Sequence, residues 1–228
     1  MPTRRYARSK PKEPIPLDGS AAISSMRICS DDPARISLCV NRQHVGRLLI
    51  ETKAKHELQV GTPWTGELAA ELKPELDRGN AFRAAVRILT KRAKSGEELR
   101  RKLREYKYEP EGIEWSINRL TELGILNDEE YARAVVRSQL RRKPAGRRFL
   151  SGKLREKGIH PSVSDVVLDE LLEERDPYED ALEIAQKASR TISAKLEPEV
   201  RHRRISGRLA RRGFDFDVIR RVLEELED

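Results

Sequence analysis

The sequence predicts a mainly α-helical protein, a tandem repeat of three three-helix units with a small N-terminal β-hairpin. Charged residues make up 37% of the 228 residues and aromatic residues only 5%, a composition that is too polar for one compact core and typical of thin helical units. The stretch Leu150–Ile159, LSGKLREKGI, returns at Ile205–Phe214 as ISGRLARRGF, with four identical positions in ten. Helix start signals recur from about residue 65 onward, so the repeated unit is helical.

The N-terminal part lacks these helix signals. Residues 1–33 contain five prolines among basic and small polar residues, so we expect a disordered basic tail there. In residues 34–64 two β-prone runs, RISLCV and RLLIETKAKHELQV, flank NRQHVG, whose Asn41 and Gly46 suit a turn. This pattern predicts a β-hairpin module. Because a lone hairpin is marginally stable in water, we expect it to pack on the first helices, with Trp64 as an anchor.

The repeat extends to a third copy. The anchor leucines Leu103, Leu154 and Leu209 are 51 and 55 residues apart, and a leucine or isoleucine precedes each of them by four residues. In every copy a leading helix comes before the anchor helix and a further amphipathic helix follows it. Units this small cannot bury their apolar faces alone, so neighbours must stack. We expect a connecting helix at residues 65–79 and three-helix repeats at residues 80–126, 127–175 and 176–228.

Several helix starts carry N-capping residues. Ser95 with Glu98, and Asn127 with Glu130, have the spacing of capping boxes. In a capping box the first side chain accepts a hydrogen bond from a free backbone amide of the helix, and the acid accepts one from the backbone amide of the first residue. Asp176 stands directly before a proline, which is tolerated at the first helical position. We therefore expect a helix to begin after each of Ser95, Asn127 and Asp176.

The ends of the anchor helices differ between the copies. Gly158 and Gly213 stand where a left-handed residue closes a helix, a conformation that glycine adopts without steric cost. Lys107 occupies this position in the first copy. We therefore expect the first anchor helix to end differently from the other two.

Positive charge gathers in the repeats, and the net charge of +8 favours anionic partners. Residues 141–157 hold eight Lys or Arg against one acid, and residues 201–212 hold six Arg and no acid. Basic stripes that recur once per repeat suit a periodic anionic partner, such as a nucleic acid or a nucleoprotein filament; exposed salt bridges between helices are the alternative. The residues expected to bind the partner or DNA are Arg141, Arg142, Lys143, Arg147, Arg148, Lys153, Arg155, Arg203, Arg204, Arg208, Arg211 and Arg212.

The sequence lacks the patterns of an enzyme. It has no glycine-rich phosphate loop, and its four histidines and two cysteines share no metal-ligand spacing, so we expect no catalytic residue, metal or cofactor. Acid pairs that hold the metal of a nuclease remain an open alternative. Cys29 and Cys39 make no disulfide framework, and no apolar run is long enough to span a membrane. We expect a cytoplasmic protein.

Three segments resemble the RecX family of bacterial recombination regulators: RILTKRAKSGEELRRKL at Arg87–Leu103, LGILNDEEYARAVVRSQ at Leu123–Gln139, and RRKPAGRRFLSGKLREKGI at Arg141–Ile159. The resemblance covers about residues 80–228, and the hairpin region is similar to an N-terminal extension of some members. Asn127 stands where aspartate is more usual. The family pattern falls on Ser95, Glu98, Leu99, Leu103, Leu126, Asn127, Asp128, Tyr131, Ala132, Lys143, Gly146, Leu150, Leu154, Lys157, Gly158 and Ile159.

The resemblance implies a non-enzymatic modulator of RecA in DNA repair, recombination and the SOS response. RecX proteins are built from three three-helix units in a curved, elongated array. They bind in the groove of the RecA–DNA filament and mainly inhibit, limiting filament extension, ATP hydrolysis and strand exchange. We therefore expect a monomer whose partner is the RecA filament on DNA, with single- or double-stranded DNA as a possible direct contact and no membrane. A stand-alone protein that binds the phosphate backbone of DNA or RNA is the alternative.

Overall fold

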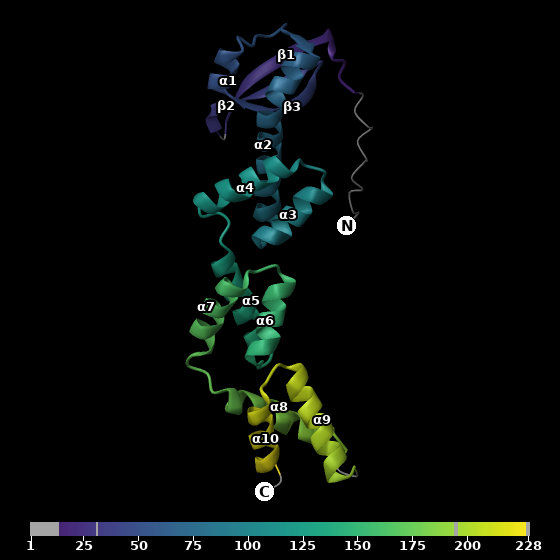
Figure 1. Cartoon of the computed structure of the whole chain (residues 1–228), viewed down its shortest axis with the longest axis vertical. Helices are drawn as coiled ribbons and strands as arrows, with labels where there is room; N and C mark the ends of the chain where they lie inside the picture. The colour runs from purple at the N-terminus through teal and green to yellow at the C-terminus, as the bar shows by residue number, and fades with distance from the viewer. Residues whose placement is uncertain (1–13, 31, 194–195, 227–228) are drawn as a thin grey trace, which may run out of the picture. The chain divides into compact units, whose positions relative to one another are not determined.

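The computed structural model describes residues 14–30, 32–193 and 196–226 (Figure 1). It divides into two compact units. The first contains the chain up to Val86 together with Leu103–Ser116, and the second contains Arg87–Lys102 and the chain from Ile117 onward. Residues 1–13, which belong to the predicted tail, lie outside the described residues.

In the described part of the first unit, four strands form one antiparallel sheet in the order β3-β2-β1-β4. The predicted hairpin is confirmed as its β2–β3 pair, in which Val40 pairs with Gln43. Asn41 and Arg42 between them both have positive φ, 46° and 64°, as a type I′ hairpin turn requires. The strands are β1 (Asp18–Cys29), β2 (Asp32–Val40), β3 (Gln43–Leu49) and β4 (Pro63–Thr65).

Strand β1 corrects the predicted tail, which was expected to be disordered through residue 33. It pairs with β2 on one side and with β4 on the other, and it buries Ala21 and Ile23 in the core. The small residues of DGSAAISSMRIC conceal this strand, because they give little β propensity. The hydrogen bonds to β2 and β4 stabilise the strand although its own sequence has low β propensity.

The second predicted run and the turn also need correction. The run ends as a strand at Leu49, and α1 (Ile50–Lys55) follows, rich in helix-forming residues. The Glu75 carboxylate accepts hydrogen bonds from the Leu49 amide and, at 2.5 Å, from the Thr52 hydroxyl. Gly46 lies inside β3 and not in the turn; a Cβ there would stand 2.7 Å from Leu76 Cδ2, so the glycine allows the strand to approach α2.

The sheet packs on α2 (Gly66–Lys91), one continuous helix of 26 residues. The predicted connecting helix and the leading helix of the first repeat are both parts of it. Leu72 and Leu76 of α2 pack with the buried faces of the strands, and Trp64 is 4% exposed in the same core, as predicted. Further along α2, the Phe82 ring meets Trp115 edge to face, with centroids 5.8 Å apart.

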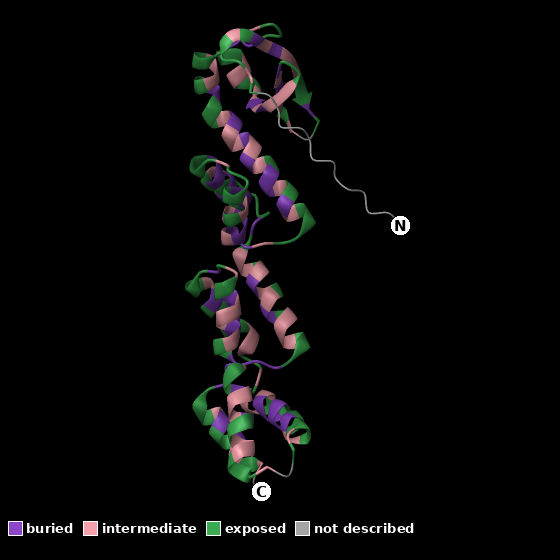
Figure 2. Ribbon diagram, turned by 90° about the vertical axis from the view of Figure 1, so that its right-hand side faces the viewer, coloured by how far each residue is buried: buried purple, intermediate pink, exposed green. Residues whose placement is uncertain are grey.

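The remaining described helices follow the predicted repeats of three. Repeats 2 and 3 each have a separate hydrophobic core, and in Figure 2 their buried residues form stripes beside exposed ones. These stripes account for the helical periodicity of the sequence. The helices are α3 (Gly96–Glu105), α4 (Pro110–Glu122), α5 (Asp128–Arg142), α6 (Arg147–Glu156), α7 (Pro161–Leu172), α8 (Pro177–Thr191), α9 (Pro198–Arg211) and α10 (Phe216–Glu225).

The predicted N-caps are confirmed. The Ser95 hydroxyl accepts from the Glu98 amide at 3.1 Å, and the Glu98 carboxylate accepts from the Ser95 amide at 3.4 Å. The Asn127 side chain accepts from the amides of the second and third residues after it, both at 3.0 Å. The Glu130 carboxylate does not accept from the Asn127 amide and lies 3.7 Å from Arg133. Asp176 accepts from the amide two residues on at 2.8 Å.

The three anchor helices end in the same way, so the expectation of a different end at Lys107 is wrong. Lys107, Gly158 and Gly213 all have positive φ, 61°, 71° and 79°. The next amide in each copy donates to the carbonyl of the anchor leucine, Leu103 in the first copy, at 3.1–3.3 Å. A non-glycine residue tolerates this conformation at a cost of about 1–2 kcal/mol.

Candidate partner-binding site

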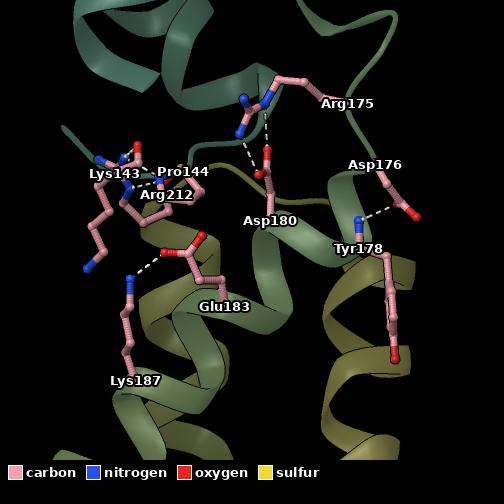
Figure 3. Close-up of polar contacts among 9 residues, drawn as sticks. All are labelled: Lys143, Pro144, Arg175, Asp176, Tyr178, Asp180, Glu183, Lys187 and Arg212. Atoms are coloured by element: carbon pink, nitrogen blue, oxygen red, sulfur yellow. Dashed lines mark hydrogen bonds and ion pairs between the residues drawn. The ribbon is translucent and has the colours of Figure 1, made fainter. Parts of the chain in front are cut away.

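The basic residues of repeats 2 and 3 are positioned by a junction that Arg212 holds together (Figure 3). The Arg212 guanidinium donates from Nε to the Pro144 carbonyl at 3.0 Å and from Nη2 to the Lys143 carbonyl at 2.7 Å. It also lies over the Phe149 ring, 4.3 Å from the centroid. Burial lowers the pKa of Arg212. This predicted binding residue is therefore engaged within the chain, and it brings the end of α9 beside the end of α5.

Two glycines allow the backbones of repeats 2 and 3 to approach closely at this junction. The Gly146 amide donates to the Arg212 carbonyl at 2.9 Å. A Cβ on Gly146 would overlap the Gly213 carbonyl, and a Cβ on Gly213 would overlap the Phe149 backbone. Arg175 of repeat 2 adds a bidentate pair with Asp180 of repeat 3, which Figure 3 also shows.

A related junction joins α3 to repeat 2. The Ser95 hydroxyl donates to the Lys157 carbonyl, as the Gly146 amide does to the Arg212 carbonyl one repeat later. The Gly96 amide donates to Asp128 at 2.8 Å. A Cβ on Gly158 would lie 2.6 Å from the Cβ of Glu97. In both cases the start of one anchor helix rests on the end of the next.

Glu98 is the buried charge of the α3 junction, at 9% exposure. It accepts from the Tyr131 hydroxyl at 2.8 Å and from Lys157 Nζ at 3.1 Å. Burial alone would raise the pKa of Glu98, but the bonds from Tyr131 and Lys157 and the charge of Lys157 outweigh it, and the pKa is lowered. Burial and the bond to Glu98 raise the pKa of Tyr131 to about 12.

Three of the predicted binding residues form ion pairs with acids of the same chain. Arg147 contacts Asp165 at 3.2 Å and Asp169 at 2.5 Å, from α6 to α7. Arg148 contacts Asp215 at 3.1 Å, and Lys153 contacts Glu156 at 2.8 Å. All of these pairs are largely exposed and each contributes well under about 1 kcal/mol. For these residues the salt-bridge alternative describes the contacts.

The other predicted residues form no ion pair with any part of the chain that the structure describes. On α9, Arg204, Arg208 and Arg211 have the i, i+4, i+7 spacing of one helix face. Arg208 is half-buried and the others are exposed. We call this set the unpaired basic residues; it comprises Arg141, Arg142, Lys143, Arg155, Arg203, Arg204, Arg208 and Arg211.

Comparison with known proteins shows the family. Models of the first, second and third three-helix domains of RecX match residues 81–120, 127–168 and 174–223, more than half of the chain. The chain belongs to the RecX family. Regulatory protein RecX of Pelodictyon phaeoclathratiforme is 35% identical over 146 residues, 64% of this chain and 88% of that protein. Regulatory protein RecX of Streptomyces coelicolor is 31% identical over 144 residues, 61% of this chain and 76% of that protein.

Solved RecX structures have the same fold. A crystal structure of regulatory protein RecX aligns with a TM-score of 0.68 at 20% identity, covering 90% of this chain and 99% of that one. The crystal structure of RecX from Lactobacillus salivarius aligns with a TM-score of 0.58 at 25% identity, covering 66% and 97%. The RecX family consists of regulatory proteins and not of enzymes.

Two further observations concern the part of the chain that the structure describes. No helix there is long and apolar enough to cross a bilayer. No three histidine, cysteine or acidic residues there lie together as ligands of a metal ion.

The RecX pattern residues have structural roles that the sequence did not reveal. Ser95, Glu98, Tyr131 and Lys157 meet in the α3 junction, and Gly146 closes the junction of repeats 2 and 3. Sequence reasoning assigned Ser95 and Glu98 the contacts of a capping box, but it predicted none of the contacts that join these residues to another repeat. Salt bridges between helices were the stated alternative, but the sequence did not identify which acids pair with Arg147 and Arg148, although the i, i+4 spacing of Asp165 and Asp169 is a visible signal.

Proposed function

We propose that this chain regulates RecA by binding in the groove of the RecA–DNA filament, and that it limits filament extension, ATP hydrolysis and strand exchange. The observation that carries the proposal is the set of unpaired basic residues in a chain of the RecX family. The protein acts as a cytoplasmic monomer. Its repeats take the bounds 80–126, 127–175 and 176–228.

The unpaired basic residues, and not the whole predicted set, dock on the filament. An arginine already bonded to acids must lose those bonds before it can bind elsewhere, whereas Arg204, Arg208 and Arg211 lose only water. Guanidinium groups bind carboxylates and phosphates through paired hydrogen bonds. A nucleoprotein filament offers both groups, carboxylates on its protein and phosphates on its DNA.

Junctions support this role because they hold the basic helices in fixed positions. Gly146 and Gly213 leave no room between repeats 2 and 3, and Arg212 ties the end of α5 to α9. Preorganised charges lose less entropy on binding than mobile ones. A filament surface that repeats along its axis therefore meets charges at fixed spacings.

The test compares two charge-removing variants as inhibitors of RecA ATP hydrolysis on single-stranded DNA. The first carries Arg204→Gln, Arg208→Gln and Arg211→Gln, and the second carries Arg147→Gln and Arg148→Gln, which are already paired. We expect the first to inhibit at least about tenfold more weakly, since each lost charged hydrogen bond contributes about 1.5–3 kcal/mol. The second should inhibit almost like the wild type. Equal inhibition by the first variant and the wild type would refute the assignment.

A stand-alone phosphate-binding protein is the second candidate, because a face of three arginines on α9 suits a strand of phosphates as well. It predicts binding to bare DNA as tight as to the filament. The aromatic residues make up 5% of the chain, which is too few for stacked bases, so such binding would lack sequence preference.

A further inference from the structure

A hollow of about 220 Å³ lies in the first unit, between the strands and α2. It is outside the three matched RecX domains except at its α2 end, where the first domain begins at residue 81. Phe82, Arg83 and Val86 lie inside that domain, and the other four lining residues lie outside it. The lining residues are Asp32, Arg35, Arg47, Gly79, Phe82, Arg83 and Val86.

One face of α2 forms a wall of the hollow. Gly79, Phe82, Arg83 and Val86 follow the i, i+3, i+4, i+7 spacing of a helix face. Gly79 allows the helix to approach β3, because a Cβ there would stand only 3.0 Å from the Arg47 carbonyl. The edge-to-face contact with Trp115 holds the Phe82 ring in place.

The opposite wall comes from the sheet. Arg35 begins the buried part of β2, and its Nη1 lies over Gly79, 3.8 Å from where a Cβ would stand. Arg35 Nε contacts Asp32 at 3.2 Å, and the Arg35 side chain is only 19% exposed. Arg47 belongs to the neighbouring strand β3, two residues before its end.

Arg35, Arg47 and Arg83 thus all line the hollow, and Asp32 is the one acid among the lining residues. Arg83 is exposed and forms no ion pair within the described residues. Arg83 can therefore receive an anion from solvent, and the lining as a whole carries more positive than negative charge.

We propose that this hollow binds a phosphate group, either free or as part of a nucleic-acid strand. Arginine forks match phosphate oxygens in pairs, and the fixed Phe82 ring gives the site one apolar wall. The volume is below the roughly 300 Å³ of the smaller ligand pockets, so it suits one phosphate and not a whole nucleotide. The site is independent of the unpaired basic residues that carry the proposed function.

The first test is calorimetric titration of the full chain with inorganic phosphate at constant ionic strength. Arg83→Ala should weaken binding about tenfold or more, given the strength of charged hydrogen bonds. Arg27→Ala, an exposed arginine of the same unit outside the hollow, is the matched control and should bind like the wild type. No binding by the wild type, or an equal loss in the control, would overturn the proposal.

Asp32→Asn separates binding from folding. It removes the one carboxylate of the lining. The asparagine keeps an oxygen that can accept the hydrogen bond from the Ala34 amide, which Asp32 accepts at 3.2 Å in the wild type. We expect it to strengthen phosphate binding, an outcome that misfolding cannot produce. Weaker binding by this variant would count against the site.

The second arm distinguishes the two sources of phosphate. Binding of a short oligothymidylate is measured by anisotropy with and without competing inorganic phosphate, in the wild type and in Arg83→Ala. Competition together with loss in the variant assigns the site to a nucleic-acid strand. Phosphate binding with unchanged oligonucleotide binding assigns it to free phosphate. RecA inhibition by Arg83→Ala stays at the wild-type level if the two sites are independent, so failure here leaves the proposed function testable.

Discussion

At the scale of single residues, Glu98 shows how a buried charge becomes tolerable. Its carboxylate is 9% exposed, and such a charge is costly unless it is paired and hydrogen-bonded. Tyr131 and Lys157, both from repeat 2, supply the two partners. The same side chain caps α3 through the Ser95 amide. Glu98 therefore couples the start of one helix to the packing of the next repeat.

Glu98→Gln should lower the free energy of unfolding by about 1–3 kcal/mol. Glutamine has one acceptor oxygen where three donors converge, and Lys157 loses its counter-charge. Urea denaturation followed by circular dichroism measures the change. Glu183→Gln, which disturbs only the exposed pair with Lys187 on α8, is the control and should change stability by less than about 0.5 kcal/mol. Equal effects of the two substitutions would contradict the role of Glu98.

The Glu98 pKa predicts a pH dependence. Because the folded pKa lies below the unfolded value, the unfolded chain binds the proton more readily, and stability rises with pH in this range. The contribution of Glu98 is complete above the unfolded pKa of about 4.3 and is lost as the pH falls through the folded pKa. The stability difference between wild type and Glu98→Gln should therefore be constant near neutral pH and shrink in acid. A difference that grows in acid would contradict this sign.

At the scale of helices, the ends of the anchor helices show two separate reasons for a glycine: a left-handed backbone and close contact with another segment. Lys107 ends α3 in the same left-handed conformation that Gly158 and Gly213 adopt, so the helix end alone does not demand glycine. Glycine stands where another segment touches the helix end, Glu97 at Gly158 and Phe149 at Gly213. Sequence patterns predict the conformation but not the contact, since the contact joins residues more than 60 positions apart.

Gly213→Ala should lower the free energy of unfolding by more than about 2 kcal/mol, because left-handed strain adds to overlap with the Phe149 backbone. Gly152→Ala is the matched control. Gly152 lies in the middle of α6, and a Cβ there would meet no atom within 4 Å, so alanine should stabilise by about 0.5–1 kcal/mol. Thermal and urea unfolding of both variants give the comparison. A neutral effect at Gly213 would contradict the described packing of repeats 2 and 3.

Helices and strands were predicted correctly where the local sequence carries a strong signal, and they were missed where pairing with a distant strand determines the structure. The caps at Ser95, Asn127 and Asp176 are local, and all three caps are found, although Glu130 does not complete the predicted box at Asn127. Strand β1 has weak β propensity and exists through its pairing with β2 and β4. Gly46 resembles a turn residue but serves the approach of β3 to α2. Composition and residue spacing do not predict such contacts between segments that are distant in the sequence.

At the scale of the whole molecule, the periodic sequence predicts three helical repeats and their basic stripes, and the family comparison confirms the repeats. The candidate site was predicted only in outline. Arg147, Arg148 and Lys153 find acids within the chain, and Arg212 is used in a junction. Which charges are left for a partner depends on the acids of neighbouring helices, and this follows only from the folded chain.

Salt should reveal the unpaired charges in binding. If they contact phosphates or carboxylates, the affinity for RecA filaments falls as salt concentration rises. The variant with Arg204→Gln, Arg208→Gln and Arg211→Gln should bind more weakly and depend less on salt than the wild type. Anisotropy titrations at several salt concentrations measure both properties. An unchanged salt dependence in this variant would contradict docking through α9.

The most direct test of the central claim compares binding to RecA filaments on single-stranded DNA with binding to the same DNA bare. Fluorescence anisotropy at physiological salt reports both affinities for the full chain. A regulator that recognises the filament should bind it much more tightly than bare DNA. Equal or tighter binding to bare DNA would contradict the proposed function and favour a protein that grips phosphates by itself.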